Sequence, residues 1–172
     1  KEKKLNAIYM GGGTPTTLRA AQMERVLFHL EQNFHMEYLQ EYTVEAGRPD
    51  SITREKLEVL YKHHVGRISI NPQTMQQKTL DLIGRRHTVE ETVQAFQLAR
   101  EIGFDNINMD LIAGLPEETP ADMADTLRQI EELMPDSLTV HALAMKHGSR
   151  LSRERAEAEE RPNYKQMAVE LE

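Results

Sequence analysis

The sequence of 172 residues contains no cysteine, and this absence removes several kinds of chemistry from the chain. Without thiols, these residues cannot form disulfides, supply a thiol nucleophile, or bind zinc or an iron–sulfur cluster through sulfur. Tryptophan is also absent, and no apolar run reaches the roughly 18 to 20 residues that a membrane-spanning helix needs. The first residues do not read as a signal peptide. We therefore expect a cytoplasmic protein that has no membrane partner.

Positive charge is in short supply as well. The chain has 21 Lys and Arg against 28 Asp and Glu, a formal net charge of −7. Nucleic-acid binding relies on an excess of cationic side chains to neutralise phosphates, so this balance argues against a nucleic-acid partner. Hydrophobic residues make up 39% and charged residues 28%, which is typical of a folded globular protein and not of a disordered chain.

Five short segments rich in β-branched residues alternate with helical patterns along the chain. The predicted strands are residues 6–10, 42–46, 67–71, 106–113 and 137–143. Helical patterns cover residues 18–34, 53–64 and 76–83, and two further helices begin at residues 88 and 119. Short connections between strands and helices predict an α/β fold with a parallel sheet and right-handed crossovers.

The two later helices carry clear start signals. Thr88 with Glu91 three residues on forms a capping box, and Thr119 is followed by Pro120 in the first turn. Asp122 is placed to interact with the positive end of the helix dipole. The stripe of apolar residues predicted to face the core in this last helix is Met123, Leu127, Ile130 and Met134.

The strands alternate polar and apolar residues, whereas parallel strands covered on both faces read as continuous apolar runs. Val44 opposes Glu45, and Met109 opposes Asn108 and Asp110. One interpretation is an α+β protein with one sheet face in water; the other is a barrel, or part of one, whose polar inner wall holds a ligand. Five βα units fall short of the eight of a full barrel. We predict a partial, TIM-like barrel over residues 1–149 and a charged helical extension over residues 150–172.

The glycine triplet at residues 11–13, followed by Thr-Pro-Thr, comes directly after the first predicted strand. Glycines allow a sharp turn and let backbone N–H groups approach a ligand closely. The segment lacks the Gly-Lys-Ser/Thr ending of a phosphate loop and does not fit Gly-x-Gly-x-x-Gly. A tight turn with no ligand remains an alternative. The position of the glycine triplet at the carboxyl end of a parallel strand favours a binding role for it.

Polar residues follow the next strands at equivalent heights. Glu45, Gln73 and Asp110 lie at or beyond the carboxyl ends of three successive strands, where they could bind ribose hydroxyls or an ammonium group. The guanidinium of Arg85 could bind a carboxylate through two hydrogen bonds. The alternative is that Arg85 belongs to a solvated basic turn. The seven histidines show no metal-binding spacing, and His141 is the one on the polar strand face. We predict no metal site in this chain.

These segments together resemble the radical S-adenosylmethionine enzymes of the oxygen-independent coproporphyrinogen III oxidase family, in its second or oxidase-like branch. The resemblance rests on residues 8–16 (IYMGGGTPT), 45–46 (EA), 67–69 (RIS) with Gln73, and 108–116 (NMDLIAGLP). Residues 71–73 (NPQ) stand where most members have Gly-Val-Gln. The match runs in order over most of the chain and implies the core of a radical S-adenosylmethionine barrel, taken from a larger enzyme.

The resemblance implies roles for particular residues at the methionine end of the cofactor. The backbone of Gly12, Gly13 and Thr14 would bind the methionine amino group. Glu45 would contact the methionine end or the ribose, and Arg85 would bind the methionine carboxylate.

For the nucleoside end, the resemblance implies that Gln73 and Asp110 bind the ribose hydroxyls. Ile112 and residues 142–144 would pack against adenine. It indicates no catalytic residue in this chain.

The family reaction implied by the resemblance is the oxidative decarboxylation of coproporphyrinogen III to protoporphyrinogen IX, in haem biosynthesis. A reduced [4Fe–4S] cluster would cleave S-adenosylmethionine to methionine and a 5′-deoxyadenosyl radical, which takes a hydrogen from a substrate propionate. The partners implied are the tetrapyrrole substrate and an electron donor. The family's Cys-x-x-x-Cys-x-x-Cys motif would precede Lys1, so we expect this chain alone to hold no cluster and to be inactive.

Three other functions remain open. Haem-chaperone relatives share these motifs without decarboxylating coproporphyrinogen, and a non-catalytic relative could bind the cofactor or a tetrapyrrole. An unrelated α/β protein could use the glycine loop for phosphate. A partial barrel also leaves unpaired strand edges, through which we expect self-association.

Overall fold

A computed structural model describes residues 4–143 of the protein. Five strands form one sheet in the order β1-β2-β3-β4-β5, with every neighbouring pair parallel. The strands are β1 (Ala7–Met10), β2 (Glu41–Gly47), β3 (Arg67–Gln73), β4 (Ile107–Ala113) and β5 (Ser137–Ala142). All five predicted strands are present. The predicted extension at residues 150–172 lies outside the described residues.

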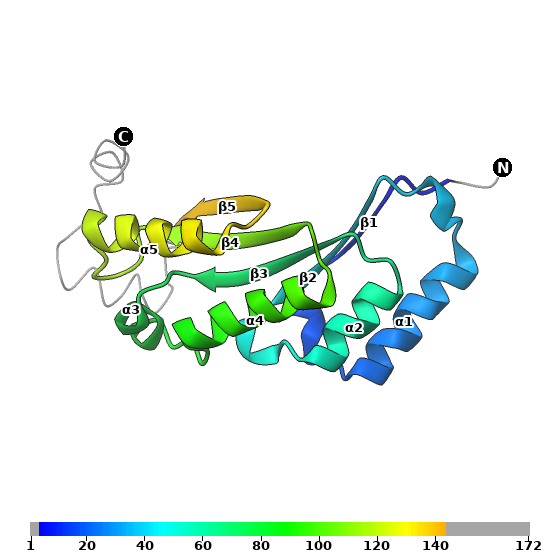
Figure 1. Cartoon of the computed structure of the whole chain (residues 1–172), viewed down its shortest axis with the longest axis horizontal. Coiled ribbons are helices and arrows are strands. Elements are labelled where there is room, and N and C mark those ends of the chain that lie inside the picture. The colour runs from blue at the N-terminus through cyan, green and yellow to red at the C-terminus, as the bar shows by residue number, and fades with distance from the viewer. Residues whose placement is uncertain (1–3, 144–172) are drawn as a thin grey trace, which may run out of the picture.

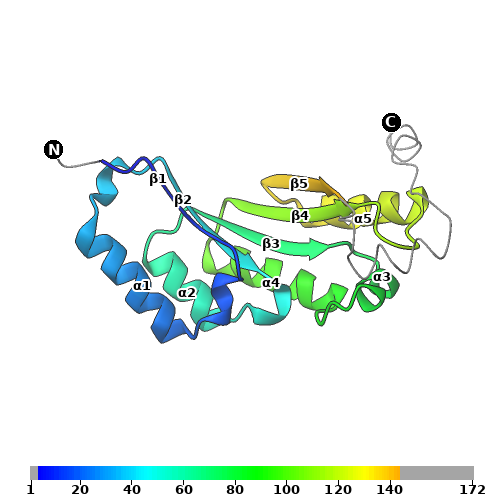
Figure 2. The same cartoon turned by 180° about the vertical axis from the view of Figure 1, so that it is seen from behind.

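Helices connect the strands as the sequence pattern predicts. They are α1 (Ala20–Asn33), α2 (Arg54–Lys62), α3 (Gln77–Leu82), α4 (Val89–Ile102) and α5 (Pro120–Leu133). Three short 3-10 turns that the sequence analysis did not predict are η1 (Pro15–Thr17), η2 (Met36–Tyr38) and η3 (Pro49–Ser51). Figures 1 and 2 show α1, α2 and α4 side by side along one side of the sheet.

The core lies between the apolar sheet face and this layer of helices. Fully buried side chains from the strands, such as Val44, Ile68 and Met109, pack with Leu27 of α1 and Leu60 of α2. The apolar side chains therefore occupy alternate strand positions, and the residues between them form the opposite wall. The predicted α/β fold with a partial barrel of about five parallel strands is confirmed.

The capping predictions are confirmed, and one prediction about the apolar stripe of α5 is wrong. Thr88 and Thr119 both form capping boxes, with Glu91 and Asp122. Met123 and Ile130 are buried, but Met134 is 72% exposed. Helix α5 ends at Leu133, and Met134 takes a left-handed conformation (φ 55°) that turns the chain toward β5. Because the helix ends at Leu133, the side chain of Met134 does not point toward the core.

Strand β1 pairs with β2 alone and β5 with β4 alone among the described residues. Leu138 and Val140 of β5 lie in register with Met109 and Leu111 but are exposed. Both edges of the sheet are thus free within residues 4–143, and association through them stays a prediction. No helix in these residues has both the length and the apolar character needed to cross a membrane.

We expect Leu60→Ala to lower the free energy of unfolding by about 2–5 kcal/mol, because Leu60 is fully buried between α2 and the sheet. Chemical denaturation followed by circular dichroism measures the change. Leu82→Ala is the matched control, since Leu82 is 50% exposed and its truncation should cost less than about 1 kcal/mol. Equal costs for the two variants would contradict the assigned core.

Candidate functional site

The glycine loop after β1 adopts a backbone that depends on its glycines. Gly12 has φ +102°, and the N–H of Thr14 donates to the Gly12 carbonyl at 2.8 Å, closing a tight turn. A Cβ added at Gly12 or Gly13 would meet no atom within 4 Å, so their backbone faces open space. A Cβ at Gly11 would lie 2.5 Å from Tyr9 Cε1 and 2.8 Å from Glu45 Cδ, closer than real contacts allow.

The loop is attached to the carboxyl end of β2. Thr14 packs against Gly47, where an added Cβ would approach Thr14 Cγ2 to 2.6 Å. The hydroxyl of buried Thr16 donates to the carbonyl of Ala46. The ammonium group of Lys56 donates to the carbonyl oxygens of Thr16, at 2.6 Å, and of Ser51, at 2.8 Å. These contacts fix the open backbone of Gly12 and Gly13 beside the end of β2.

Glu45 of β2 joins the loop to the polar wall. Its Oε2 accepts a hydrogen bond of 3.0 Å from the Gly12 N–H, and its Oε1 accepts one from the Tyr9 hydroxyl. The hydrogen bond to Glu45 raises the pKa of Tyr9 to about 12, with burial and the Glu45 charge adding to the effect. The predicted neighbours Gly12 and Glu45 are thus in direct contact.

Asp110 of β4 lies at the centre of a polar network on the same wall. Its Oδ1 accepts from the amide of Asn108, whose Oδ1 in turn accepts from Ser137 at 3.0 Å and from Thr139 at 3.1 Å. Arg67 donates to Ser137 Oγ at 3.2 Å. Burial raises the pKa of Asp110, opposed by the hydrogen bond from Asn108. A partly desolvated carboxylate has lost part of its hydration, so it needs hydrogen-bond donors in place of water. Hydroxyl groups of a ligand can supply such donors.

Ile112 and His141 continue this wall beyond Asp110. They face each other across the β4–β5 pair, with Ile112 half-buried and His141 exposed. The charges of His141 and Glu45 both act on Asp110, the first lowering and the second raising its pKa. Of the residues predicted to pack on adenine, 142 and 143 are described and 144 lies outside the described residues.

Gln73 is the last residue of β3, two residues beyond the predicted end of that strand. It is almost fully buried, has a left-handed backbone (φ 72°) and pairs with Leu111 after an irregularity in the strand register. The buried His87 donates from Nε2 to the carbonyl of Pro72 at 3.0 Å and ties the later loop to this strand end. The position of Gln73 at the carboxyl edge is as predicted.

Arg85 lies close to Arg48 and Asp50, which follow β2 in the chain. Burial lowers the pKa of its guanidinium, and the neighbouring positive charge of Arg48 lowers it further, while Asp50 opposes both. The structure therefore places Arg85 at the same edge as Glu45. Arg85 is half-buried and Arg86 is exposed, and the carboxylate-binding role of Arg85 stays a prediction.

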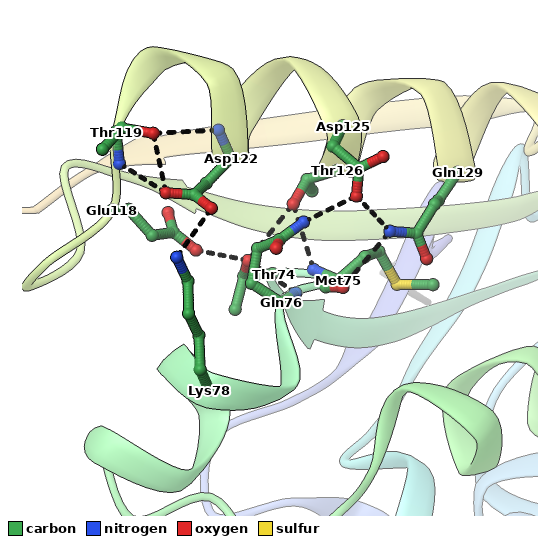
Figure 3. A network of polar contacts seen from close by, with 10 residues as sticks. All are labelled: Thr74, Met75, Gln76, Lys78, Glu118, Thr119, Asp122, Asp125, Thr126 and Gln129. Carbon is green, nitrogen blue, oxygen red and sulfur yellow. Dashed lines mark hydrogen bonds and ion pairs between the residues drawn. The ribbon is translucent and has the colours of Figure 1, made fainter.

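A polar network clamps the segment after Gln73 onto α5 (Figure 3). The buried hydroxyl of Thr126 accepts from the N–H of Met75 at 3.3 Å, and Thr74 donates to Glu118. Gln76 donates to Asp125 at 2.8 Å. The segment that connects Gln73 to α3 is thereby held on helix α5, which fixes the direction in which the chain leaves β3.

The start of α5 belongs to the same network. Thr119 and Asp122 form its capping box, and Lys78 of α3 makes an ion pair with Asp122 at 2.8 Å (Figure 3). Burial raises the pKa of Glu118, opposed by the Thr74 hydrogen bond. No sequence pattern indicated Glu118 or Thr126 as part of this support, because the pairing of residues about 50 positions apart is set by the fold.

Tyr9 and Asn108 are two further wall residues that the sequence analysis did not select. The alternation of polar and apolar residues in the strand placed Asn108 on the polar face. For Tyr9, the sequence offered only its position two residues before Gly11. Residues 4–143 contain no group of three or more metal-ligating side chains, and the whole sequence lacks cysteine. The donor set of this chain therefore does not fit an iron–sulfur cluster.

Residues 1–130 match the family model described as the Radical SAM superfamily, and the chain belongs to this superfamily. It is 50% identical over 151 residues to the oxygen-independent coproporphyrinogen-III oxidase-like protein HemZ of Bacillus subtilis, covering 87% of this chain and 30% of HemZ. It is 36% identical over 143 residues to the heme chaperone HemW of Lactococcus lactis, covering 83% of this chain and 38% of HemW.

The fold agrees with a solved relative. The coproporphyrinogen III oxidase HemN from Escherichia coli, a radical SAM enzyme, superposes with a TM-score of 0.83 at 30% identity, over 98% of this chain and 38% of that one. The five parallel strands are therefore the partial barrel of the radical SAM fold. The chain spans about a third of the length of these relatives, and its resemblance to the coproporphyrinogen oxidase family is confirmed.

We expect Asp122 to make stability depend on pH below about 4. The hydrogen bond from Lys78 and the two from Thr119 lower its pKa from 3.8 to about 2. Because the folded pKa is below the unfolded one, this contribution is present above about pH 4 and is lost as the pH falls through about 2. The difference in free energy of unfolding between the unaltered protein and Asp122→Asn should shrink by about 1 kcal/mol between pH 5 and 2, allowing for solvent screening. A difference that stays constant with pH would contradict the assignment.

Proposed function

We propose that this chain is the S-adenosylmethionine-binding wall of a radical SAM oxidoreductase that, as a complete protein, oxidatively decarboxylates coproporphyrinogen III in haem biosynthesis. The observation that carries the proposal is the contact of the open glycine loop after β1 with Glu45 of β2, on the same polar wall as the half-buried Asp110 of β4. The 50% identity with HemZ, named an oxygen-independent coproporphyrinogen-III oxidase-like protein, supports the reaction class.

The chemistry of the wall suits the separate parts of S-adenosylmethionine. The backbone carbonyl oxygens of the glycine loop, with the carboxylate of Glu45, suit the methionine ammonium, and Arg85 suits its carboxylate. Gln73 and Asp110 offer an amide and a carboxylate to the ribose hydroxyls. Ile112 offers an apolar surface to adenine. In this arrangement the chain binds and orients the cofactor and keeps water from the reacting end.

The cluster that would cleave the bound cofactor requires cysteines that this chain does not have. We propose that they belong to a part of the complete protein outside these 172 residues, together with the surfaces that bind the tetrapyrrole and the electron donor. When bound, the cluster supplies the electron for reductive cleavage of S-adenosylmethionine. We propose a cytoplasmic location for the complete protein.

A second candidate function is that of a heme chaperone. The 36% identity with HemW of Lactococcus lactis favours it, since the match covers nearly the same part of this chain as the match with HemZ. Both functions use the same cofactor-binding wall, so the complete protein's products distinguish them.

We expect Asp110→Asn and Arg85→Ala each to weaken S-adenosylmethionine binding by about 10- to 100-fold, because each removes a charged hydrogen-bonding group. Isothermal titration calorimetry on the complete protein measures the affinity, and melting temperature checks the fold. Asp105→Asn and Arg86→Ala are matched controls at exposed positions. Unchanged affinity in both site variants would contradict the assigned roles.

We expect the complete protein, reconstituted with iron and sulfide without oxygen, to hold a four-iron cluster and to release 5′-deoxyadenosine under reduction. Added coproporphyrinogen III should yield vinyl-bearing product and carbon dioxide, detected by chromatography and gas analysis. Cofactor cleavage and stoichiometric haem binding without decarboxylation would establish the chaperone function in its place. No cluster and no cleavage would exclude the decarboxylase function and leave a protein that binds without catalysis.

A further inference from the structure

Tyr9 lies on the polar wall between the glycine loop and Glu45, and the proposed function assigns it no role. It is the third residue of β1, and its register partner on β2 is Thr43. Glu45 lies two residues further along β2 on the same face, the diagonal position that a long aromatic side chain reaches. The Tyr9 hydroxyl donates to Glu45 Oε1. Although the ring makes this contact, Tyr9 is 59% exposed, so its side chain borders the open wall.

The carboxylate of Glu45 is held from both of its oxygens. Oε1 accepts from Tyr9 and Oε2 accepts from the Gly12 N–H at 3.0 Å. An ionised carboxylate has about four acceptor positions, so these two contacts leave others available for a ligand. Tyr9 therefore restricts the rotation of Glu45 without using up its capacity to accept hydrogen bonds.

The backbone of Gly11 is packed between the same two side chains. A Cβ at Gly11 would collide with Tyr9 Cε1 and with Glu45 Cδ. The phenol ring, the carboxylate and the glycine loop thus form one close-packed unit. The hydrogen bond to Glu45 also raises the pKa of Tyr9 to about 12, so the phenol remains a neutral donor throughout the physiological range.

We propose that Tyr9 is a positioning residue of the cofactor site, which fixes the Glu45 carboxylate and the glycine loop in the orientation that receives the cationic methionine end of S-adenosylmethionine. This inference rests on the proposed function of the same wall. A glutamate has three rotatable side-chain bonds, and ordering it before the ligand arrives removes part of the entropy cost of binding.

The test compares S-adenosylmethionine binding by the complete protein and its Tyr9→Phe variant, using isothermal titration calorimetry. Phenylalanine keeps the ring on Gly11 and removes only the hydroxyl, at an exposed position where the fold tolerates the change. We expect the dissociation constant to rise about tenfold, as for the loss of one hydrogen bond to a charged group. The melting temperature should stay within about 2 °C. Tyr38→Phe is the matched control, because Tyr38 is an exposed tyrosine of η2 whose ring contacts Lys4 and His35.

A double-mutant cycle with Glu45→Ala separates positioning from direct contact. If Tyr9 acts through Glu45, Tyr9→Phe should change the affinity of the Glu45→Ala protein by less than about twofold. An undiminished tenfold loss in that background, or an unchanged affinity of Tyr9→Phe alone, would overturn the inference and leave the proposed function standing. Absence of S-adenosylmethionine binding by the unaltered protein would overturn the proposed function and this inference together.

Discussion

Successive side chains of a β-strand point to opposite faces of the sheet, and in this protein the helices cover one of those faces. Every other part of the structure depends on this division. Val44, Ile68 and Met109 face the helices and form the core. Glu45 and Asp110, one position along, are then obliged to face the opposite wall. Polar side chains that would be costly in the core become available for binding.

The polar groups of the wall are ordered by contacts with one another. Asn108 connects Asp110 to the hydroxyls of β5, and Glu45 connects Tyr9 to the glycine loop. Burial raises the pKa of Asp110, so its charge is held at an energetic cost. A ligand that donates hydrogen bonds to it relieves that cost, which is how a partly desolvated carboxylate gains affinity for hydroxyl groups.

Support for the wall at the carboxyl end of β3 comes from α5 and the segment before it. The contacts of Thr126 with Met75 and of Glu118 with Thr74 hold the segment after Gln73 on α5. Gln73 precedes this segment in the sequence and Arg85 follows it. The side chain of His87, two residues after Arg85, donates to the carbonyl of Pro72. Gln73, with its left-handed backbone, lies between two of these contacts, at Pro72 and at Met75.

The sequence by itself determined the strands, the capping boxes of α4 and α5 and the polar identity of Glu45 and Asp110, because strand alternation and helix caps are local patterns. It also indicated the family, through the segments around the glycine loop and residues 108–116. Only the tertiary structure decided that Tyr9 meets Glu45, that Arg85 lies near Arg48, and that Thr126 holds Met75. Those contacts join residues from about 35 to 50 positions apart, and they depend on strand register, on the irregularity before Gln73 and on where α5 packs. No local pattern encodes such pairings, since each is fixed by the close packing of elements that are distant in the chain.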